Sequence, residues 1–146
     1  MERKNKNRGY QQLRVWQDAI ELYKKTCTVF TQTPYEYKRV ISNQIASVDS
    51  IHRNIAEGYA RRGLKEYINF LYIALSSLAE SVSGIYAYYE CKQVSADDYN
   101  ELDTLSYKLE NSLLRLIQSL EQKKTNGEWE SSLIIRESNE IYDITQ

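Results

Sequence analysis

The polar residues between Ser50 and Arg62 are the chain's best candidates for chemistry, in the string Ser-Ile-His-Arg-Asn-Ile-Ala-Glu-Gly-Tyr-Ala-Arg-Arg. Glu57 lies three residues after Asn54 and four before Arg61, so the three side chains share one face of a helix. In an enzyme, Glu57 would act as an acid or base and Arg61 would clamp an anion. Alternatively, these residues and Glu66 form a structural polar network where two helices meet. We favour the structural interpretation.

Other chemistry-bearing residues lack the spacing that a catalytic, cofactor-binding or metal site needs. His52, the single histidine, stands beside Asp49 and Arg53 in an order that builds no nucleophilic triad. Cys27 and Cys91 lie far apart, without the paired spacing of a zinc site. The Glu-x-x-His spacing of di-iron bundles is also absent. We therefore expect no enzyme activity and no cofactor.

Basic side chains offer a different function, nucleic-acid binding. Arg53, Arg61, Arg62 and Lys65 are expected at one end of a helical bundle, and guanidinium groups suit phosphate contacts. Residues 1–9 add four basic side chains against one acidic one and predict a flexible basic arm. A formal net charge of -1 argues against a general polycation. A solvated basic face is the commoner use of such residues, and nucleic-acid binding stays as the alternative.

Hydrophobic periodicity predicts four amphipathic helices, because apolar residues recur at steps of three and four. Asp18 falls outside the apolar stripe of the first predicted helix. The predicted core stripes are Leu13, Trp16, Ile20, Tyr23, Cys27 and Phe30; Tyr37, Ile41, Gln44, Val48, Ile51 and Ile55; Leu64, Ile68, Leu71, Leu75, Leu78, Val82, Ile85 and Tyr89; and Tyr99, Leu102, Leu109, Leu113, Leu116 and Leu120.

Local signals place the helix ends. Thr33-Pro34-Tyr35-Glu36 predicts a capping box that starts the second helix. Gly58, near that helix's end, predicts either a close approach by a neighbouring helix or a point where the helix frays or kinks, because glycine is unfavourable inside helices. Ser95, followed by two aspartates, predicts the N-cap of the fourth helix. Asn126-Gly127 predicts its stop.

These elements predict an all-α protein, an antiparallel up-down-up-down four-helix bundle with a short C-terminal extension. We divide the chain into the basic arm 1–9, the bundle 10–124 and an acidic, apolar extension 125–146. We leave open whether the extension docks on the bundle, docks on a neighbouring subunit or forms a mobile tail. Without an unbroken apolar run of about twenty residues or a secretory signal, we expect a cytoplasmic protein with no membrane partner.

Apolar residues outside the main stripes predict contact between copies of the chain. They lie on the third and fourth helices, where a monomeric bundle does not need them, and Tyr and Leu of this kind suit a subunit interface. These residues are Tyr72, Tyr86, Tyr88, Leu105 and Leu114. The sequence thus favours a homo-oligomer.

Several strings together are similar to a known family. They are Leu13-Arg14-Val15-Trp16-Gln17-Asp18-Ala19, Ser50-Ile51, Asn54-Ile55-Ala56-Glu57-Gly58 with Arg61, Glu66-Tyr67-Ile68-Asn69-Phe70-Leu71 and Ala74-Leu75-Ser76-Ser77-Leu78-Ala79-Glu80. Over residues 10–122 the chain resembles the bacterial four-helix bundle proteins first noticed as products of intervening sequences in large-subunit ribosomal RNA genes. The resemblance implies an antiparallel four-helix bundle, commonly a homopentamer, with no known catalytic activity.

The resemblance also suggests kinship with the accessory variability proteins of diversity-generating retroelements, which are basic pentamers that bind a reverse transcriptase and nucleic acid. The chain departs from the family's pattern at two places, and the first, together with the acidic C-terminal extension, counts against carrying RNA binding over. Many members have an arginine doublet shortly before the Ser-Ile pair, where this chain has Ile45-Ala46-Ser47-Val48-Asp49. A glycine typical of the third helix is missing from Ala74-Leu75-Ser76-Ser77-Leu78. The leading hypothesis is a non-enzymatic, homo-oligomeric scaffold or adaptor. The alternative is a nucleic-acid or ribonucleoprotein accessory factor, acting with rRNA or a reverse transcriptase.

Overall fold

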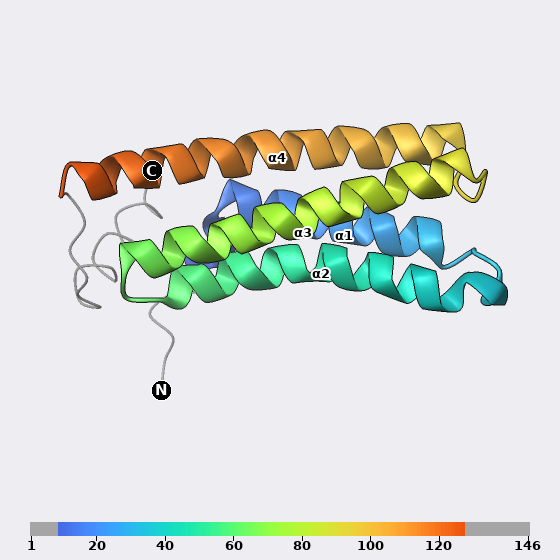
Figure 1. The fold of residues 1–146 in the computed structure, drawn as a ribbon, viewed down its shortest axis with the longest axis horizontal. Helices are drawn as coiled ribbons and strands as arrows, with labels where there is room; N and C mark the ends of the chain where they lie inside the picture. Colours follow the sequence, from blue (N-terminus) through green and yellow to red (C-terminus); the bar gives the residue numbers. More distant parts are fainter. Residues whose placement is uncertain (1–8, 128–146) are drawn as a thin grey trace.

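Four long helices run alternately up and down one axis (Figure 1). The structure is a computed structural model that describes residues 9–127. Its elements are η1 (Gly9–Gln12), α1 (Arg14–Phe30), η2 (Tyr35–Tyr37), α2 (Lys38–Ala60), α3 (Leu64–Glu90) and α4 (Ala96–Thr125). Successive helices pack side by side and α4 closes the bundle against α1, with the most extensive contact between α2 and α3. The predicted antiparallel four-helix bundle is confirmed. Residues 1–8 of the predicted arm and 128–146 of the predicted extension lie outside the described residues, while Gly9 begins η1.

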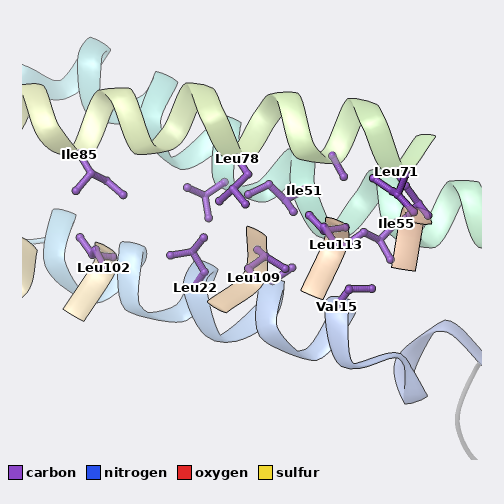
Figure 2. Close-up of a cluster of buried hydrophobic side chains, with 14 of the residues drawn as sticks. Val15, Leu22, Ile51, Ile55, Leu71, Leu78, Ile85, Leu102, Leu109 and Leu113 are labelled. Carbon is purple, nitrogen blue, oxygen red and sulfur yellow. The ribbon is translucent and has the colours of Figure 1, made fainter. Parts of the chain in front are cut away.

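A continuous apolar core fills the centre of the bundle, with side chains from all four helices pointing inward (Figure 2). The α2 stripe predicted from Ile41 to Ile55 is buried as expected, whereas Tyr37, its first member, is 38% exposed. The labelled core residues are Val15, Leu22, Ile51, Ile55, Leu71, Leu78, Ile85, Leu102, Leu109 and Leu113.

The buried face of α1 is rotated relative to the predicted stripe. Val15, Leu22 and Thr26 are buried, while the predicted Trp16, Ile20, Tyr23 and Cys27 are only half-buried. Asp18, expected outside the stripe, is 8% exposed. Its carboxylate lies 3.3 Å from Lys108 Nζ and accepts a hydrogen bond of 3.3 Å from Ser112 Oγ, both on α4. The prediction was wrong because α4 supplies partners that let this carboxylate turn inward.

The start of α2 also differs from the prediction. The chain first forms the 3₁₀ turn η2, and neither Pro34 before η2 nor Tyr37 before α2 provides a side-chain cap. The capping box expected from Thr33 and Glu36 is therefore wrong. At α4 the predictions are confirmed, since Ser95 Oγ accepts a hydrogen bond of 3.1 Å from the Asp98 N–H. The helix ends at Thr125, Asn126 is its C-cap, and Gly127 follows with φ of 67°.

Gly58 lets α2 and α3 approach closely, which is one of its two predicted roles. A Cβ atom built on Gly58 would lie 2.6 Å from Phe70 Cβ and 3.2 Å from the carbonyl oxygen of Tyr67. Real side chains do not tolerate the first distance, so the interface requires glycine here. The same interface is joined by Gln44, whose buried amide donates a hydrogen bond of 2.9 Å to the carbonyl oxygen of Ser81.

α3 is the most apolar helix. By length and composition alone it could cross a membrane, although the sequence lacks an unbroken apolar run. One such helix is weak evidence for a span, because the core helix of a water-soluble protein passes the same test. Only 33% of its most apolar window is buried inside the bundle. Tyr72, Ile73 and Tyr86 of this helix are exposed, whereas its half-buried Leu75 and Val82 still pack against the core.

Candidate functional site

The predicted basic cluster lies where α2 ends and α3 begins, but its members have different surroundings. Arg53 sits on the side of α2 and donates from Nε to Asp49 Oδ2 at 2.5 Å. His52 Nε2 lies 2.9 Å from the other oxygen of that carboxylate. Burial of the Asp49 carboxyl alone would raise its pKa, but the hydrogen bonds from Arg53 and His52 outweigh it and lower the pKa. Arg53 is thus held by an ion pair on its own helix.

Arg61 is also engaged. Its Nη2 donates to Glu57 Oε1 at 2.7 Å, and its guanidinium carbon lies 4.9 Å from the centre of the Phe70 ring. Arg62 and Lys65 are exposed, and no described residue forms an ion pair with either. Of the four predicted nucleic-acid contacts, the structure therefore leaves two cations fully available.

The predicted polar network is formed only in part. Glu57 and Arg61 pair as expected, but their side chains are 52% and 44% exposed. Asn54 turns back along α2 instead, donating from Nδ2 to the carbonyl oxygen of Ser50 at 2.8 Å. Glu66 is exposed and is joined to none of these residues by a hydrogen bond in the described part of the chain. The polar link between α2 and α3 at this level comes from two hydroxyls outside the predicted network, since Ser50 Oγ and Ser77 Oγ lie 3.0 Å apart.

Replacing Glu57 with alanine is expected to lower the free energy of unfolding by only about 0.3–0.5 kcal/mol. The reason is that the Glu57–Arg61 pair is a surface pair four residues apart on one helix. Urea unfolding followed by circular dichroism measures the change, with Glu36→Ala, at an exposed site outside the pair, as the control. A decrease of several kcal/mol in the free energy of unfolding would show that Glu57 contributes as much to stability as a member of a buried polar network.

Aromatic side chains close the end of the bundle where α2 meets α3. The Tyr59 ring packs edge-on against Tyr67, with centroids 6.1 Å apart, and against Tyr10 of η1 at 6.5 Å. Tyr10 in turn packs against Trp16 with centroids 5.5 Å apart. Tyr59 and Tyr67, the tyrosines nearest to the basic cluster, are therefore occupied in packing rather than presented as stacking platforms for bases.

The outer face of α3 carries a row of exposed, uncharged residues spaced by three and four. The row, which we call the outer α3 row, is Tyr72, Ser76, Ala79, Ser83 and Tyr86. Its two tyrosines are 47% and 54% exposed, and Ile73 beside them is 47% exposed. Between Tyr67 and Tyr89 the only charged residue of α3 is Glu80. An apolar surface of this kind is typical of a protein–protein contact.

Three other residues predicted for a subunit contact have different positions. Tyr88 is only 6% exposed, and its hydroxyl donates to the carbonyl oxygen of Val40 at 2.7 Å. That prediction was wrong, because the ring packs against Phe30 with centroids 5.0 Å apart while the hydroxyl finds a backbone acceptor. Leu105 is half-buried against the core, and Leu114 is 38% exposed.

No three His, Cys, Asp or Glu side chains among residues 9–127 group so as to hold a metal ion. Cys27 is half-buried and Cys91 is exposed, and both are free thiols.

Comparison with known proteins agrees with this fold. The family model of the 23S rRNA-intervening sequence proteins matches residues 11–115, from η1 well into α4. The chain belongs to this family. As a 23S rRNA-intervening sequence protein, it is also similar to a solved structure from Bacteroides thetaiotaomicron, described as a protein with unknown function from the S23 ribosomal protein family.

That structure superposes with a TM-score of 0.68 at 18% sequence identity and covers 76% of this chain and 99% of its own. At this identity the likeness concerns the fold alone. The search of curated proteins found no match. Membership of the 23S rRNA-intervening sequence family therefore supports the resemblance seen in the sequence, and the function has to be argued from the surfaces described above.

Proposed function

We propose that this chain is a non-enzymatic scaffold or adaptor that works as a homo-oligomer, and that its copies meet through the outer α3 row. The observation that carries the proposal is the exposure of this row on the most apolar helix, two-thirds of whose most apolar window is not buried in the bundle. Leaving the rings of Tyr72 and Tyr86 and the neighbouring Ile73 in water costs roughly 25 cal/mol per Å² of exposed apolar surface. A second copy that covers the row removes that cost.

The residue types in the row suit a close contact between helices. Ser76, Ala79 and Ser83 are small, so another helix can approach their backbone, and the tyrosines at the two ends offer large rings. Tyrosine is enriched in protein interfaces, because it buries a wide apolar area and keeps a polar tip. The family resemblance suggests five copies, and the row is where we expect each copy to meet its neighbour.

Replacing Tyr72 and Tyr86 together with glutamate is expected to convert the oligomer to monomers. Two carboxylates would be buried without partners in each contact, and each unpaired buried charge costs several kcal/mol. Size-exclusion chromatography with light scattering measures the mass. Tyr35→Glu is the control, since Tyr35 is 79% exposed on η2, away from the row. An oligomer of unchanged mass in the double variant would place the contact elsewhere.

A second candidate, contact with RNA or a ribonucleoprotein, is favoured by one observation. Arg62 and Lys65 are exposed and lack ion-pair partners in the described part of the chain; Arg62 lies in the connection between α2 and α3, and Lys65 lies in the first turn of α3. Two cations alone give weak, sequence-independent binding to phosphates. The adaptor proposal would then include a ribonucleoprotein as the partner at this end of the bundle.

Replacing Arg62 and Lys65 with alanine is expected to weaken RNA binding and to lower its dependence on salt. Each lost phosphate contact reduces the slope of log K against log salt by about 0.7 for a single strand. Fluorescence anisotropy of a labelled single-stranded RNA at several salt concentrations gives this slope. Lys38→Ala with Arg39→Ala, at the opposite end of α2, is the matched control. Absence of binding by the unaltered chain at low salt would remove this candidate.

A further inference from the structure

A groove between α1 and α4 has an apolar floor and two arginines at its rim. It has a volume of about 300 Å³ and is lined by Leu13, Arg14, Val15, Ser112, Arg115 and Leu116. Val15 is 4% exposed, and the two leucines are half-buried against the core. We call this site the α1–α4 groove. It is separate from the outer α3 row and from the basic cluster.

The charges of the groove have no counter-ion in the described part of the chain. Arg14 and Arg115 are exposed and form no ion pair with residues 9–127. The nearest carboxylate on α1, that of Asp18, is already bound to Lys108 and Ser112. Two guanidinium groups beside an apolar floor suit a segment that combines carboxylates with aliphatic or aromatic side chains.

The end of the same chain has this composition. Residues 128–146 contain five of the chain's acidic residues and one basic residue, so the rest of the chain is net positive. The apolar residues of this segment are Trp129, Leu133, Ile134, Ile135, Ile141, Tyr142 and Ile144. Glu130 precedes the apolar run Leu133-Ile134-Ile135 and Glu137 follows it, so one carboxylate lies on each side of the run in the sequence.

The segment also begins close enough to reach the groove. Leu116 and Thr125 are nine residues apart on α4, which is about 14 Å at 1.5 Å per residue. From Thr125 to Leu133 an extended chain spans up to about 26 Å. Gly127, with φ of 67°, supplies a turn at the helix end. The chain can therefore fold back along α4 and bring Leu133 to the groove of its own bundle.

We propose that residues 128–146 dock in the α1–α4 groove of their own chain. The run Leu133-Ile134-Ile135 covers the apolar floor, and Glu130 and Glu137 face Arg14 and Arg115. Docking there would cover a groove whose two arginines form no ion pair with residues 9–127. Docking would also remove the apolar run from water. It would leave the outer α3 row free to contact other copies of the chain.

An arginine-specific protease tests the proposal on the full chain, because Arg136 is the only basic residue of residues 128–146. Docking protects the bond after Arg136, and intact-mass spectrometry follows the release of residues 137–146. The unaltered chain should be cleaved there at least about tenfold more slowly than a free peptide of residues 128–146. Equal rates would overturn the proposal.

Reversing both rim charges, Arg14→Glu with Arg115→Glu, should speed cleavage at Arg136 about tenfold, since about 1.4 kcal/mol corresponds to a factor of ten. Lys38→Glu with Arg39→Glu, two exposed residues at the start of α2, is the matched control and should leave the rate unchanged. Adding Glu130→Lys and Glu137→Lys to the groove variant restores opposite charges and should restore protection, which also shows that the variant is folded. Protection that persists in the groove variant would place the segment elsewhere and overturn the proposal.

A mixing experiment separates docking within one chain from docking on a neighbouring copy. The groove variant, with its segment intact, is mixed with an excess of Ile134→Asp protein, whose groove is intact and whose own segment no longer competes. Cleavage of the groove variant should stay fast. Slower cleavage on mixing would show that the segment docks on a second copy, which contradicts the proposal for the same chain.

Discussion

Truncating Leu109 to alanine is expected to lower the free energy of unfolding by about 2–5 kcal/mol. Leu109 is fully buried on α4 and points into the centre of the core, among side chains from the other three helices (Figure 2). Neighbours in four rigid helices cannot all move to fill the space of three missing carbon atoms, so a cavity adds to the lost burial. The loss would be a large part of the stability of a domain of this size.

Leu114→Ala on the same helix is the matched control, because Leu114 is 38% exposed. It removes the same atoms and should change the free energy of unfolding by about 0.5 kcal/mol or less. Both variants are measured by urea unfolding at one protein concentration, because association of several copies would make the free energy of unfolding depend on concentration. Equal losses in the two variants would contradict the core as described.

Replacing Gly58 with alanine is expected to destabilise the bundle by about 1–3 kcal/mol, although alanine is the better helix former by roughly 1 kcal/mol. The added methyl group would meet Phe70 Cβ at 2.6 Å and Tyr67 Cδ2 at 3.1 Å. Phe70 Cβ is fixed to the backbone of α3, so only a shift of one helix against the other relieves the contact. The gain in helix propensity is too small to offset that shift.

Gly63→Ala is the control for Gly58. At Gly63 the nearest atom to a new Cβ is Glu66 Cγ at 3.9 Å, an ordinary contact with the far part of a flexible side chain. Thermal unfolding of the two variants should therefore give a clear loss at Gly58 and a smaller loss at Gly63, the N-cap of α3, where alanine is less favourable than glycine but meets no close atom. A stabilised Gly58→Ala variant would show that the helix end relaxes and that close approach of α2 and α3 is not required there.

The sequence predicted the buried face of a helix correctly where the helix has a single apolar stripe. In α2 the run from Ile41 to Ile55 has one apolar stripe, and the structure buries it. In α1 two neighbouring stripes compete, and the buried one contains Asp18 and Thr26. That choice depends on Lys108 and Ser112 of α4, which no local pattern links to Asp18.

The candidate sites were harder to predict, because they depend on which side chains meet across helices. The sequence correctly paired Glu57 with Arg61, since spacing on one helix fixes that contact. It could not foresee that Tyr88 turns inward, because the acceptor is the carbonyl oxygen of Val40 on another helix. It also gave no sign of the α1–α4 groove, since Arg14 and Arg115 lie at opposite ends of the bundle domain in sequence.

The mass of the unaltered chain in solution tests the central proposal most directly. Light scattering across the micromolar range should give a multiple of the 17.2 kDa chain mass, with five copies expected from the family resemblance. The outer α3 row is the surface that such an assembly would cover. A mass of 17.2 kDa at every concentration would contradict the proposal that this protein works as a homo-oligomer.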